Sequence, residues 1–547
     1  MKKVHSALFL IGALAFTAFM FFRAAPDMWS EDLKLPEQQH IIAPVQLEII
    51  AQVGPWPTIS RLIGYRGRLW FANSVKGRNH NSADIWSLDP ATGTARYERN
   101  LFSQDAGHPL VYKDLLYWPL EDALLSFGNG IVDVTNGETW QSLTIANQPI
   151  YHTSQLLAHP DGLFAVTGTR NAGLQLSQDA GRSWEEFYIH PTPTTHVSRL
   201  KELTIFKGEI YASLKDAKIK RLTRWTGNDF QTVRSWPLNR YFNGLNVHQG
   251  AIYGLVGQGR EREIWKFDGQ KSLRVGFKGP FTDLASDGKN LWLVTRDGHL
   301  WSSPKGEQWR RHGDLAKGKP VSIHSISGYI YVAGTGDDGR GIIWGRAGAK
   351  IPSGPQNPAI VLQVGAKSRN RDWDNIGQEL DRLLADRASY QNFANNSLWN
   401  RIDQIARDRP PSGFFAKRLA VNFPDQKISA FGGSMELTTK DLAYAYLLWG
   451  MKQSGLGEVP VAFLKDRWQS KPNSYEKYFE LELNAIRTIQ TTGQNDTQTV
   501  KALVDRLSYP DDPIWFRSQV IGTLTAVSGQ KFGYDIAAWQ NWASEKD

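Results

Sequence analysis

The chain has 547 residues, which is too many for a single hydrophobic core, so we expect two or three folding units. Its 41% hydrophobic and 21% charged residues exclude a largely disordered chain, and its 49 Gly and 26 Pro exclude collagen-like and Pro-rich classes. The net charge of +9 is small for this length and predicts no nucleic-acid partner, while the absence of Cys excludes disulfides, thiol catalysis and Cys-bound metals.

Residues 7–22 form an apolar run that follows two lysines near the N-terminus. As a helix its sixteen residues would span about 24 Å, slightly less than the hydrocarbon layer of a bilayer. The sequence directly after the run contains no Ala-x-Ala cleavage pattern. We therefore expect residues 1–26 to be an uncleaved, single-pass signal anchor in the cytoplasmic membrane, with a linker at 27–44 and the bulk of the chain on the outer, periplasmic side. A removed signal peptide, which would leave an exported soluble protein, is the alternative.

Residues 45–350 consist of short alternating apolar and polar runs that end at Gly, Asp or Asn, which is typical of strands joined by turns. A turn followed by an apolar pair ending in an aromatic recurs seven times, with aromatics at Trp70, Tyr117, Phe164, Tyr211, Tyr253, Trp292 and Tyr331. The spacings are 47, 47, 47, 42, 39 and 39 residues, and in every unit but the second a Leu or Ile lies eight residues earlier. This period predicts a seven-bladed β-propeller. Because an extra strand at 45–53 precedes the first inner strand, we expect it to close the ring as the outer strand of the last blade.

The sharpest local motif is the segment SQDAGRSW, which matches the Asp-box pattern S-x-D-x-G-x-[ST]-W. Here the chain resembles the sialidase-like, BNR-repeat propellers. In such a turn the side chains of Ser177 and Asp179 can bond backbone N–H groups, and Gly181 supplies a positive φ. Trp184 is expected to pack between blades. The family's Asp-boxes lie away from the catalytic face, so the resemblance implies a structural role. Two divergent copies lie at residues 133–140 and 302–309.

The same resemblance implies an active site with an Arg triad, a Tyr nucleophile paired with a Glu, and an Asp acid/base. Arg61 matches the position of the first triad Arg. However, Ile63 replaces the family's Pro, and the following strand has no Glu where the family pattern requires one. Asp84 is the only acid nearby, and it lies inside a predicted strand. Arg61 and Asp84 are therefore the catalytic candidates, and the departures from the pattern favour a protein that is not an enzyme.

Propellers bind ligands at the mouth of the central channel, where the inner strands begin. The ligand-binding candidates near these positions are Arg61, His152, His196, Asn243, Asp283 and His324. No HxH, HxxxH or HExxH spacing and no phosphate-binding loop occur, so we expect neither a metal nor a cofactor. The loops around Trp56, Tyr151 and Tyr241 are candidates for partner contact, because exposed aromatic residues dominate interface energetics.

A turn-rich linker at 351–369 precedes a region, 370–547, in which the apolar period changes from two to 3.6 residues. This periodicity predicts an array of α-helical hairpins. The expected helices cover residues 373–389, 397–408, 439–454, 458–467, 475–491, 497–508 and 513–528. Near the end, the segment GQKFGYD and the helix with Trp539 and Trp542 look like the terminal unit of bacterial HEAT-repeat proteins, a resemblance that implies fold only.

Together these patterns predict a multidomain β + α protein: a transmembrane helix, a seven-bladed propeller and a HEAT-like helical domain. The leading hypothesis is a non-enzymatic scaffold or assembly factor on the outer face of the cytoplasmic membrane, with protein partners in the membrane or envelope. The alternative is a sialidase-like propeller that binds or hydrolyses a glycan. The identity of the partner or ligand cannot be deduced from these patterns.

Overall fold

The computed structural model describes residues 45–75, 83–121, 130–145, 150, 152–168, 170–193, 195–216, 219–237, 241–258, 261–354, 371–390, 397–430, 435–465 and 481–546. The predicted anchor at 1–26 and the predicted linker at 27–44 lie outside these residues. Within the described part of the chain, no helix is both long and apolar enough to cross a membrane.

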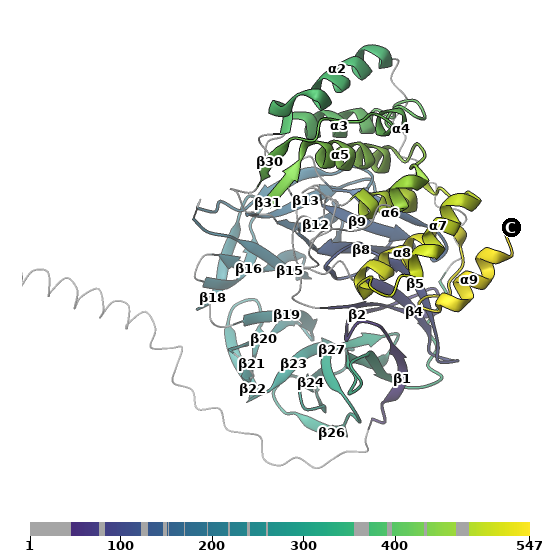
Figure 1. Cartoon of the computed structure of the whole chain (residues 1–547). Coiled ribbons are helices and arrows are strands. Elements are labelled where there is room, and N and C mark those ends of the chain that lie inside the picture. The colour runs from purple at the N-terminus through teal and green to yellow at the C-terminus, as the bar shows by residue number, and fades with distance from the viewer. Residues whose placement is uncertain are drawn as a thin grey trace, which may run out of the picture.

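The described strands β1 to β29 form a β-propeller of seven blades, here called blades 1 to 7 (Figure 1). Blades 2 and 3 are joined in one nine-stranded sheet by the pairing of β8 with β11. Blade 1 contains β2 (Thr58–Tyr65), β3 (Arg68–Ser74), β4 (Asp84–Asp89) and β5 (Thr94–Asn100). Blade 2 contains β6 (Asp105–Ala106), β7 (Leu110–Tyr112), β8 (Leu115–Glu121), β9 (Ile131–Thr135) and β10 (Trp140–Thr144). Blade 3 contains β11 (His152–His159), β12 (Gly162–Gly168), β13 (Ala172–Ser177) and β14 (Glu185–Ile189). Blade 4 contains β15 (Arg199–Phe206), β16 (Glu209–Asp216), β17 (Ile219–Trp225) and β18 (Phe230–Pro237).

The remaining blades have the same four-stranded plan. Blade 5 contains β19 (Tyr241–His248), β20 (Ala251–Gln258), β21 (Glu261–Phe267) and β22 (Ser272–Gly279). Blade 6 contains β23 (Phe281–Ser286), β24 (Leu291–Thr295), β25 (His299–Ser303) and β26 (Arg310–Asp314). Blade 7 contains β27 (Lys319–Ile326), β28 (Tyr329–Thr335), β29 (Gly341–Gly345) and, from the start of the chain, β1 (Glu48–Val53).

The ring is closed as the sequence predicts. Strand β1 pairs antiparallel with β29, with Glu48 opposite Gly345 and Val53 opposite Gly341. Because blade 7 takes its outer strand from the N-terminal end of the ring, the first and last blades are held together by main-chain hydrogen bonds.

The repeated aromatic residues form the packing between blades. Trp70 shares a buried cluster with Leu116 and Trp118 of blade 2, and Tyr211 of blade 4 shares one with Val256 of blade 5. The aromatic period in the sequence is therefore the period of the inter-blade core.

A second repeated feature, which was not predicted from the sequence, joins the inner strands of neighbouring blades. Six inner strands carry a register shift at the same place, and the residue after it often bonds the main chain of the next blade. Gln155 accepts from Leu203 N at 2.6 Å, and Glu202 accepts from Leu245 N at 2.8 Å. These bonds fix neighbouring blades beside each other around the central channel.

The last third of the chain is helical, with most boundaries close to those predicted. Its elements are α2 (Trp373–Ala385), η2 (Arg387–Tyr390), α3 (Ser397–Arg407), α4 (Ala416–Leu419), α5 (Thr439–Ser454), η5 (Val461–Leu464), α6 (Leu481–Thr492), α7 (Thr497–Leu507), α8 (Ile514–Ser528) and α9 (Ile536–Ser544). The helix expected at 458–467 is only the short 3-10 helix η5, because Pro460 at its start and Gly457 before it interrupt the backbone pattern. A hairpin of β30 (Lys427–Ala430) and β31 (Met435–Thr438) was not predicted.

The helical domain packs on blades 1 and 2, as Figure 1 shows for α8 beside β4 and β5. One continuous apolar cluster contains Trp56 and Tyr97 of the propeller together with the cores of α3, α5, α6 and α8. Thr144 at the end of β10 also bonds Gln453 of α5. The two domains therefore share a core.

Candidate functional site

The central channel brings together four of the predicted ligand-binding residues and adds Glu121. The imidazole Nδ1 of His152 lies 3.5 Å from Glu121 Oε1, and the two residues are also the one register pair between β11 and β8. Burial raises the pKa of Glu121, but the hydrogen bond from His152 and the charges of Lys201, His152 and Arg61 bring it down to about 2. The channel therefore holds a carboxylate that stays ionised.

Asp283 and His324 also lie near Arg61, whose charge acts on both. Burial raises the pKa of Asp283 to about 6, against the N–H bond from Ile323 and the charge of Arg61, which lower it. Asp283 Oδ2 accepts that bond at 3.1 Å, so it serves as an inter-blade contact. Burial and the charge of Arg61 lower the pKa of His324 to about 3, which keeps its imidazole neutral near pH 7. The charge of Arg61 thus acts on two carboxylates of this chain, Glu121 and Asp283, which compete with a substrate carboxylate for it.

Other predicted residues have different surroundings. His196 lies in the loop between blades 3 and 4, where Thr195 lies 2.9 Å from its ring. The side chain of Asn243 and all of Tyr151 lie outside the described residues. Trp56, expected on an exposed loop, is instead buried in the core that the two domains share, and its indole N–H donates to Asp84 at 2.9 Å.

Asp84 is the centre of the contact between the two domains. Its carboxylate has no exposure and accepts five hydrogen bonds, from Trp56, Tyr97, Asn100, Ser518 and Tyr534. Ser518 of α8 donates at 2.6 Å and Tyr534, from the GQKFGYD segment, also at 2.6 Å. Burial raises the pKa of Asp84 to about 6, although the donors lower it in part. A carboxylate enclosed in this way holds the domains together and is not accessible to a substrate.

The GQKFGYD segment supplies further contacts to blade 1. Lys531 pairs with the buried carboxylate of Glu98, and Gly533 lies against Tyr97 and Trp86. On α8, Gly522 lies so close to Asn100 that a Cβ would come within 2.5 Å of the Asn100 Cβ. The GQKFGYD segment therefore docks the helical domain on blade 1 of the propeller.

The turn at Ser177–Trp184 has the hydrogen bonds that its sequence predicts. Asp179 accepts from Ser183 N at 2.8 Å and from Ser177 Oγ at 2.8 Å, and Gly181, with φ +93°, donates to Ser177 Oγ at 2.7 Å. Trp184 Nε1 donates to Gly181 O at 3.0 Å. These bonds close the turn on itself, in keeping with a structural role.

A groove lies where blades 1 and 2 meet the helical domain, and it is the candidate functional site. Its cavity has a volume of about 540 Å³, within the range typical of ligand sites. The residues that line it, here called the junction groove, are Arg66, Arg68, Trp70, Arg96, Asn136, Gly137, Glu138, Ser353 and Lys531.

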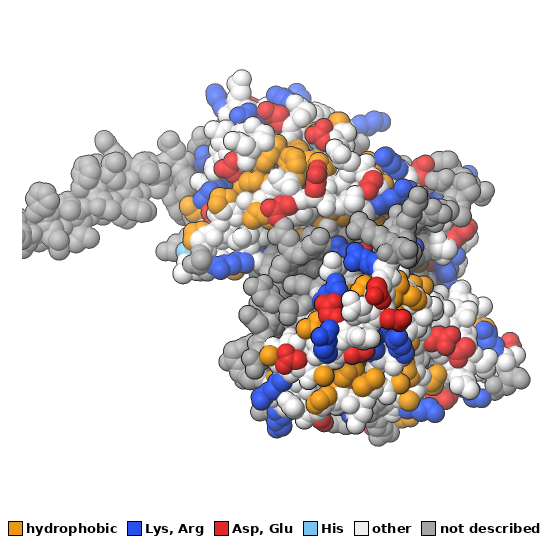
Figure 2. Space-filling view, turned by 90° about the horizontal axis from the view of Figure 1, so that it is seen from above, with side chains coloured by type: hydrophobic (Ala, Val, Ile, Leu, Met, Phe, Trp, Pro, Cys, Tyr) orange, Lys and Arg blue, Asp and Glu red, His pale blue; other side chains and the backbone are white. Residues whose placement is uncertain are grey.

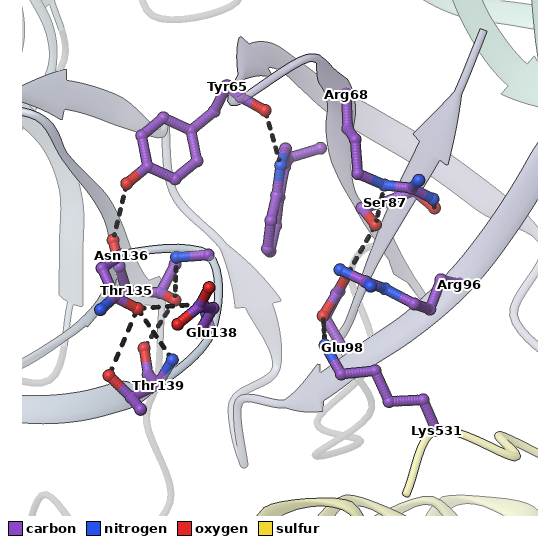
Figure 3. Close-up of polar contacts among 12 residues, drawn as sticks. Tyr65, Arg68, Ser87, Arg96, Glu98, Thr135, Asn136, Glu138, Thr139 and Lys531 are labelled. Carbon is purple, nitrogen blue, oxygen red and sulfur yellow. Dashed lines mark hydrogen bonds and ion pairs between the residues drawn. The ribbon is translucent and has the colours of Figure 1, made fainter. Parts of the chain in front are cut away.

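Figure 3 shows the two walls of the groove, with Arg68, Arg96 and Lys531 on one side and the turn that carries Asn136 and Glu138 on the other. On the blade 1 wall, Arg68 Nε donates to Ser87 Oγ at 2.8 Å, and Ser87 Oγ donates to Glu98 at 2.5 Å. Glu98 also receives Arg96 Nε at 2.8 Å and the ammonium of Lys531. This wall is therefore a row of cations arranged around one buried carboxylate.

The opposite wall is the turn between β9 and β10, one of the divergent copies of the Ser177 turn. Thr135 Oγ1 accepts from Gly137 N at 2.9 Å, and Asn136 Oδ1 accepts from Glu138 N at 2.9 Å and Thr139 N at 2.8 Å. The turn is thus closed by its own side chains, and its backbone donors are in use.

Sequence reasoning missed this groove, since three of its cations come from blade 1 and the fourth, Lys531, comes from the far end of the chain. The sequence pattern identifies the turn before Trp70 only as part of the repeat, and Lys531 only as part of the GQKFGYD segment. The one available signal was in GQKFGYD, where a Lys and a Tyr, two side chains that can bond a neighbouring domain, lie in a segment expected to end the helical array. What each of them contacts is fixed by the docking of the domains.

The described residues contain no group of three or more His, Asp or Glu side chains placed to hold a metal ion. No family model matches the chain, and no curated protein matches it either. Solved structures that are similar include the Pan2 WD40 domain of Neurospora crassa, at 10% identity and a TM-score of 0.42, covering 56% of this chain and 97% of that one.

Two further similar structures are YCF48 from Cyanidioschyzon merolae and the computationally designed Ika8 protein. YCF48 is 13% identical with a TM-score of 0.38, covering 54% of this chain and 98% of its own. Ika8 is 13% identical with a TM-score of 0.34, covering 57% and 99%. These scores are too low to carry an argument about function, so the fold rests on the strand pairing. The chain is a β-propeller followed by a helical C-terminal part.

Proposed function

We propose that the chain is a non-enzymatic binding scaffold or assembly factor that engages a protein partner at the junction groove. The observation that carries the proposal is the composite origin of this groove, which has walls from two blades and Lys531 from the helical domain. Because the Asp84 contacts fix the domains against each other, the groove is preorganised, which lowers the cost of ordering on binding.

The surroundings of the catalytic candidates support binding over chemistry. Asp84 is enclosed by hydrogen-bond donors, and Arg61 lies among carboxylates. On the face seen in Figure 2, basic and acidic side chains are interspersed, which supports a protein partner over nucleic acid.

The finer fold assignments and the location belong to the same proposal. The Ser177 turn supports a relationship to Asp-box propellers, and the paired helices α5–α6 and α7–α8 support a HEAT-like array. We place the protein on the outer face of the cytoplasmic membrane, anchored by residues 7–22. Full-length protein is expected to stay in the membrane fraction after a carbonate wash, and a mature N-terminus beyond residue 23 would instead leave an exported soluble protein.

Site-specific photocrosslinking in native membranes tests the scaffold. A photoreactive amino acid replaces Glu138, which is exposed on the rim of the groove. The matched control replaces Asn228, which is equally exposed in the turn between β17 and β18 of blade 4. A reproducible adduct with one membrane or envelope protein is expected at Glu138 and not at Asn228. Equal adducts at both positions, or none at Glu138, would count against the proposal.

A glycan-binding or glycan-hydrolysing propeller is the second candidate, favoured by one observation. Arg61, Glu121 and His152 face the same channel, where an ionised carboxylate lies beside a cation and an imidazole. Hydrolysis of a sialoside by the full-length protein that is lost in Arg61→Ala would support this candidate and remove the scaffold proposal.

A further inference from the structure

We propose that the junction groove binds an acidic peptide segment of the partner, with its carboxylates held by the guanidinium groups of Arg66, Arg68 and Arg96. The inference rests on the proposed function, since it names the chemistry of the partner. It is carried by the groove itself and by the charges that line it.

Four cations and one exposed carboxylate line the cavity. The cations are Arg66, Arg68, Arg96 and Lys531, and the carboxylate is Glu138. The buried carboxylate of Glu98 behind the lining is already shared by Arg96 and Lys531. The cavity therefore has an excess of positive charge, which a ligand with several carboxylates would balance.

Arg66 has unused capacity to donate. It occupies the left-handed position of the β2–β3 turn, with φ +46°, and its side chain lies against Gly137 on the opposite wall. Among the described residues, its buried Nη2 has no hydrogen-bond partner. The guanidinium carbon lies 5.5 Å from the centre of the Tyr65 ring, which helps to enclose this donor. A shift of the Arg66 side chain toward the cavity would let a ligand carboxylate accept a strong, charge-assisted bond from Nη2.

The blade 1 wall also carries an excess of positive charge. Arg68 donates from Nε to Ser87 Oγ and from Nη2 to the carbonyl oxygens of Ser87 and Thr94. These bonds orient its guanidinium group beside that of Arg96. Burial and the charge of Arg96 lower the pKa of Arg68, although Glu98 partly opposes this. Two guanidinium groups held side by side make a fitting receptor for carboxylates, which they can bind bidentately.

A peptide fits these features better than a free phosphate does. Phosphate sites are usually built from backbone N–H groups that converge on one point, but those of Gly137, Glu138 and Thr139 are already bonded within their turn. The cations instead lie on both walls, Arg66 against Gly137 and Arg96 with Lys531 at Glu98. Carboxylates spaced along an extended chain can reach both walls at once.

The test is binding of fluorescein-labelled hexaglutamate to the full-length protein in mild detergent, followed by fluorescence polarisation. The variant is Arg66→Asn, because Asn tolerates the left-handed backbone of this position. The matched control is Lys207→Asn, which removes one positive charge from the corresponding turn of blade 4, where φ is +52° and a Gly follows as in blade 1. Hexaglutamate is expected to bind, and Arg66→Asn is expected to weaken it about tenfold or more while Lys207→Asn changes it less than twofold.

Three outcomes would overturn the inference. These are an absence of hexaglutamate binding, equal effects of Arg66→Asn and Lys207→Asn, and displacement of hexaglutamate by inorganic phosphate at equal concentration of charge. The result is separable from the photocrosslinking test. A Glu138 adduct that persists in Arg66→Asn would leave the scaffold standing without the acidic peptide, and hexaglutamate binding without any adduct would leave the groove chemistry without the scaffold.

Discussion

Replacing Asp84 with Ala should weaken the propeller and its contact with the helical domain together. The substitution removes the acceptor of five buried hydrogen bonds, two of which come from the helical domain at 2.6 Å. Hydrogen bonds to a charged group each contribute roughly 1.5–3 kcal/mol, and the donors left behind would be buried without a partner. Opposing this, the raised pKa of Asp84, about 6, corresponds to a burial cost of roughly 3 kcal/mol near neutral pH.

The net loss should be about 3–5 kcal/mol, the usual result of removing one partner from a buried charged network. For unfolding units of this size, that loss lowers the thermal midpoint by roughly 6–20 °C. Differential scanning calorimetry of the full-length protein measures the midpoint, and proteolysis of α9 reports whether the helical domain separates first. Asp338→Ala is the matched control, since Asp338 bonds Arg340 and Gln52 on the surface. It should change stability by less than about 0.5 kcal/mol. If Asp84→Ala and Asp338→Ala behave alike, the assignment of Asp84 as the link between the domains is wrong.

Three further outcomes are expected. Because the folded pKa of Asp84 is raised to about 6, the part of its contribution to stability that depends on protonation is complete below about pH 4 and is lost as the pH rises through 6. The thermal midpoint of wild type relative to Asp84→Asn should therefore fall over this range in a calorimetric pH series. Asp179→Ala should cost about 1–2 kcal/mol through its lost turn bonds, measured by urea denaturation, and an unchanged midpoint would contradict the structural role of the turn. Gly522→Ala should cost about 1–3 kcal/mol, because its Cβ would clash with Asn100 at 2.5 Å, and hydrogen exchange in α8 and β5 should rise together; exchange that rises in α8 alone would argue against tight docking at this point.

The repeat was readable from the sequence because it is local. Each blade needs a turn, an apolar pair and an aromatic that packs on the next blade, so the aromatic spacing revealed both the propeller and its seven units. The closing strand followed from the same logic, since the first strand had no other place to pair. Most helix boundaries were predicted as well, because the apolar period of 3.6 residues is a local signal. The structure adds local capping residues at these ends, such as Thr438 at the start of α5 and Gly455 at its end.

The junction groove and the role of Asp84 were decided only by tertiary structure. Asp84 and Tyr534 are 450 residues apart, and no local pattern relates an acid in one strand to a hydroxyl in a turn near the end of the chain. The same holds for Glu98 and Lys531, and for the hairpin β30–β31, whose short strands have too few residues to set a clear period. Periodicity encodes which face of an element is buried, but it does not encode which other element covers that face. That choice depends on shape and charge complementarity between whole domains. This complementarity buries Asp84 between the two domains and brings Lys531 to the three arginines of blade 1 in one groove.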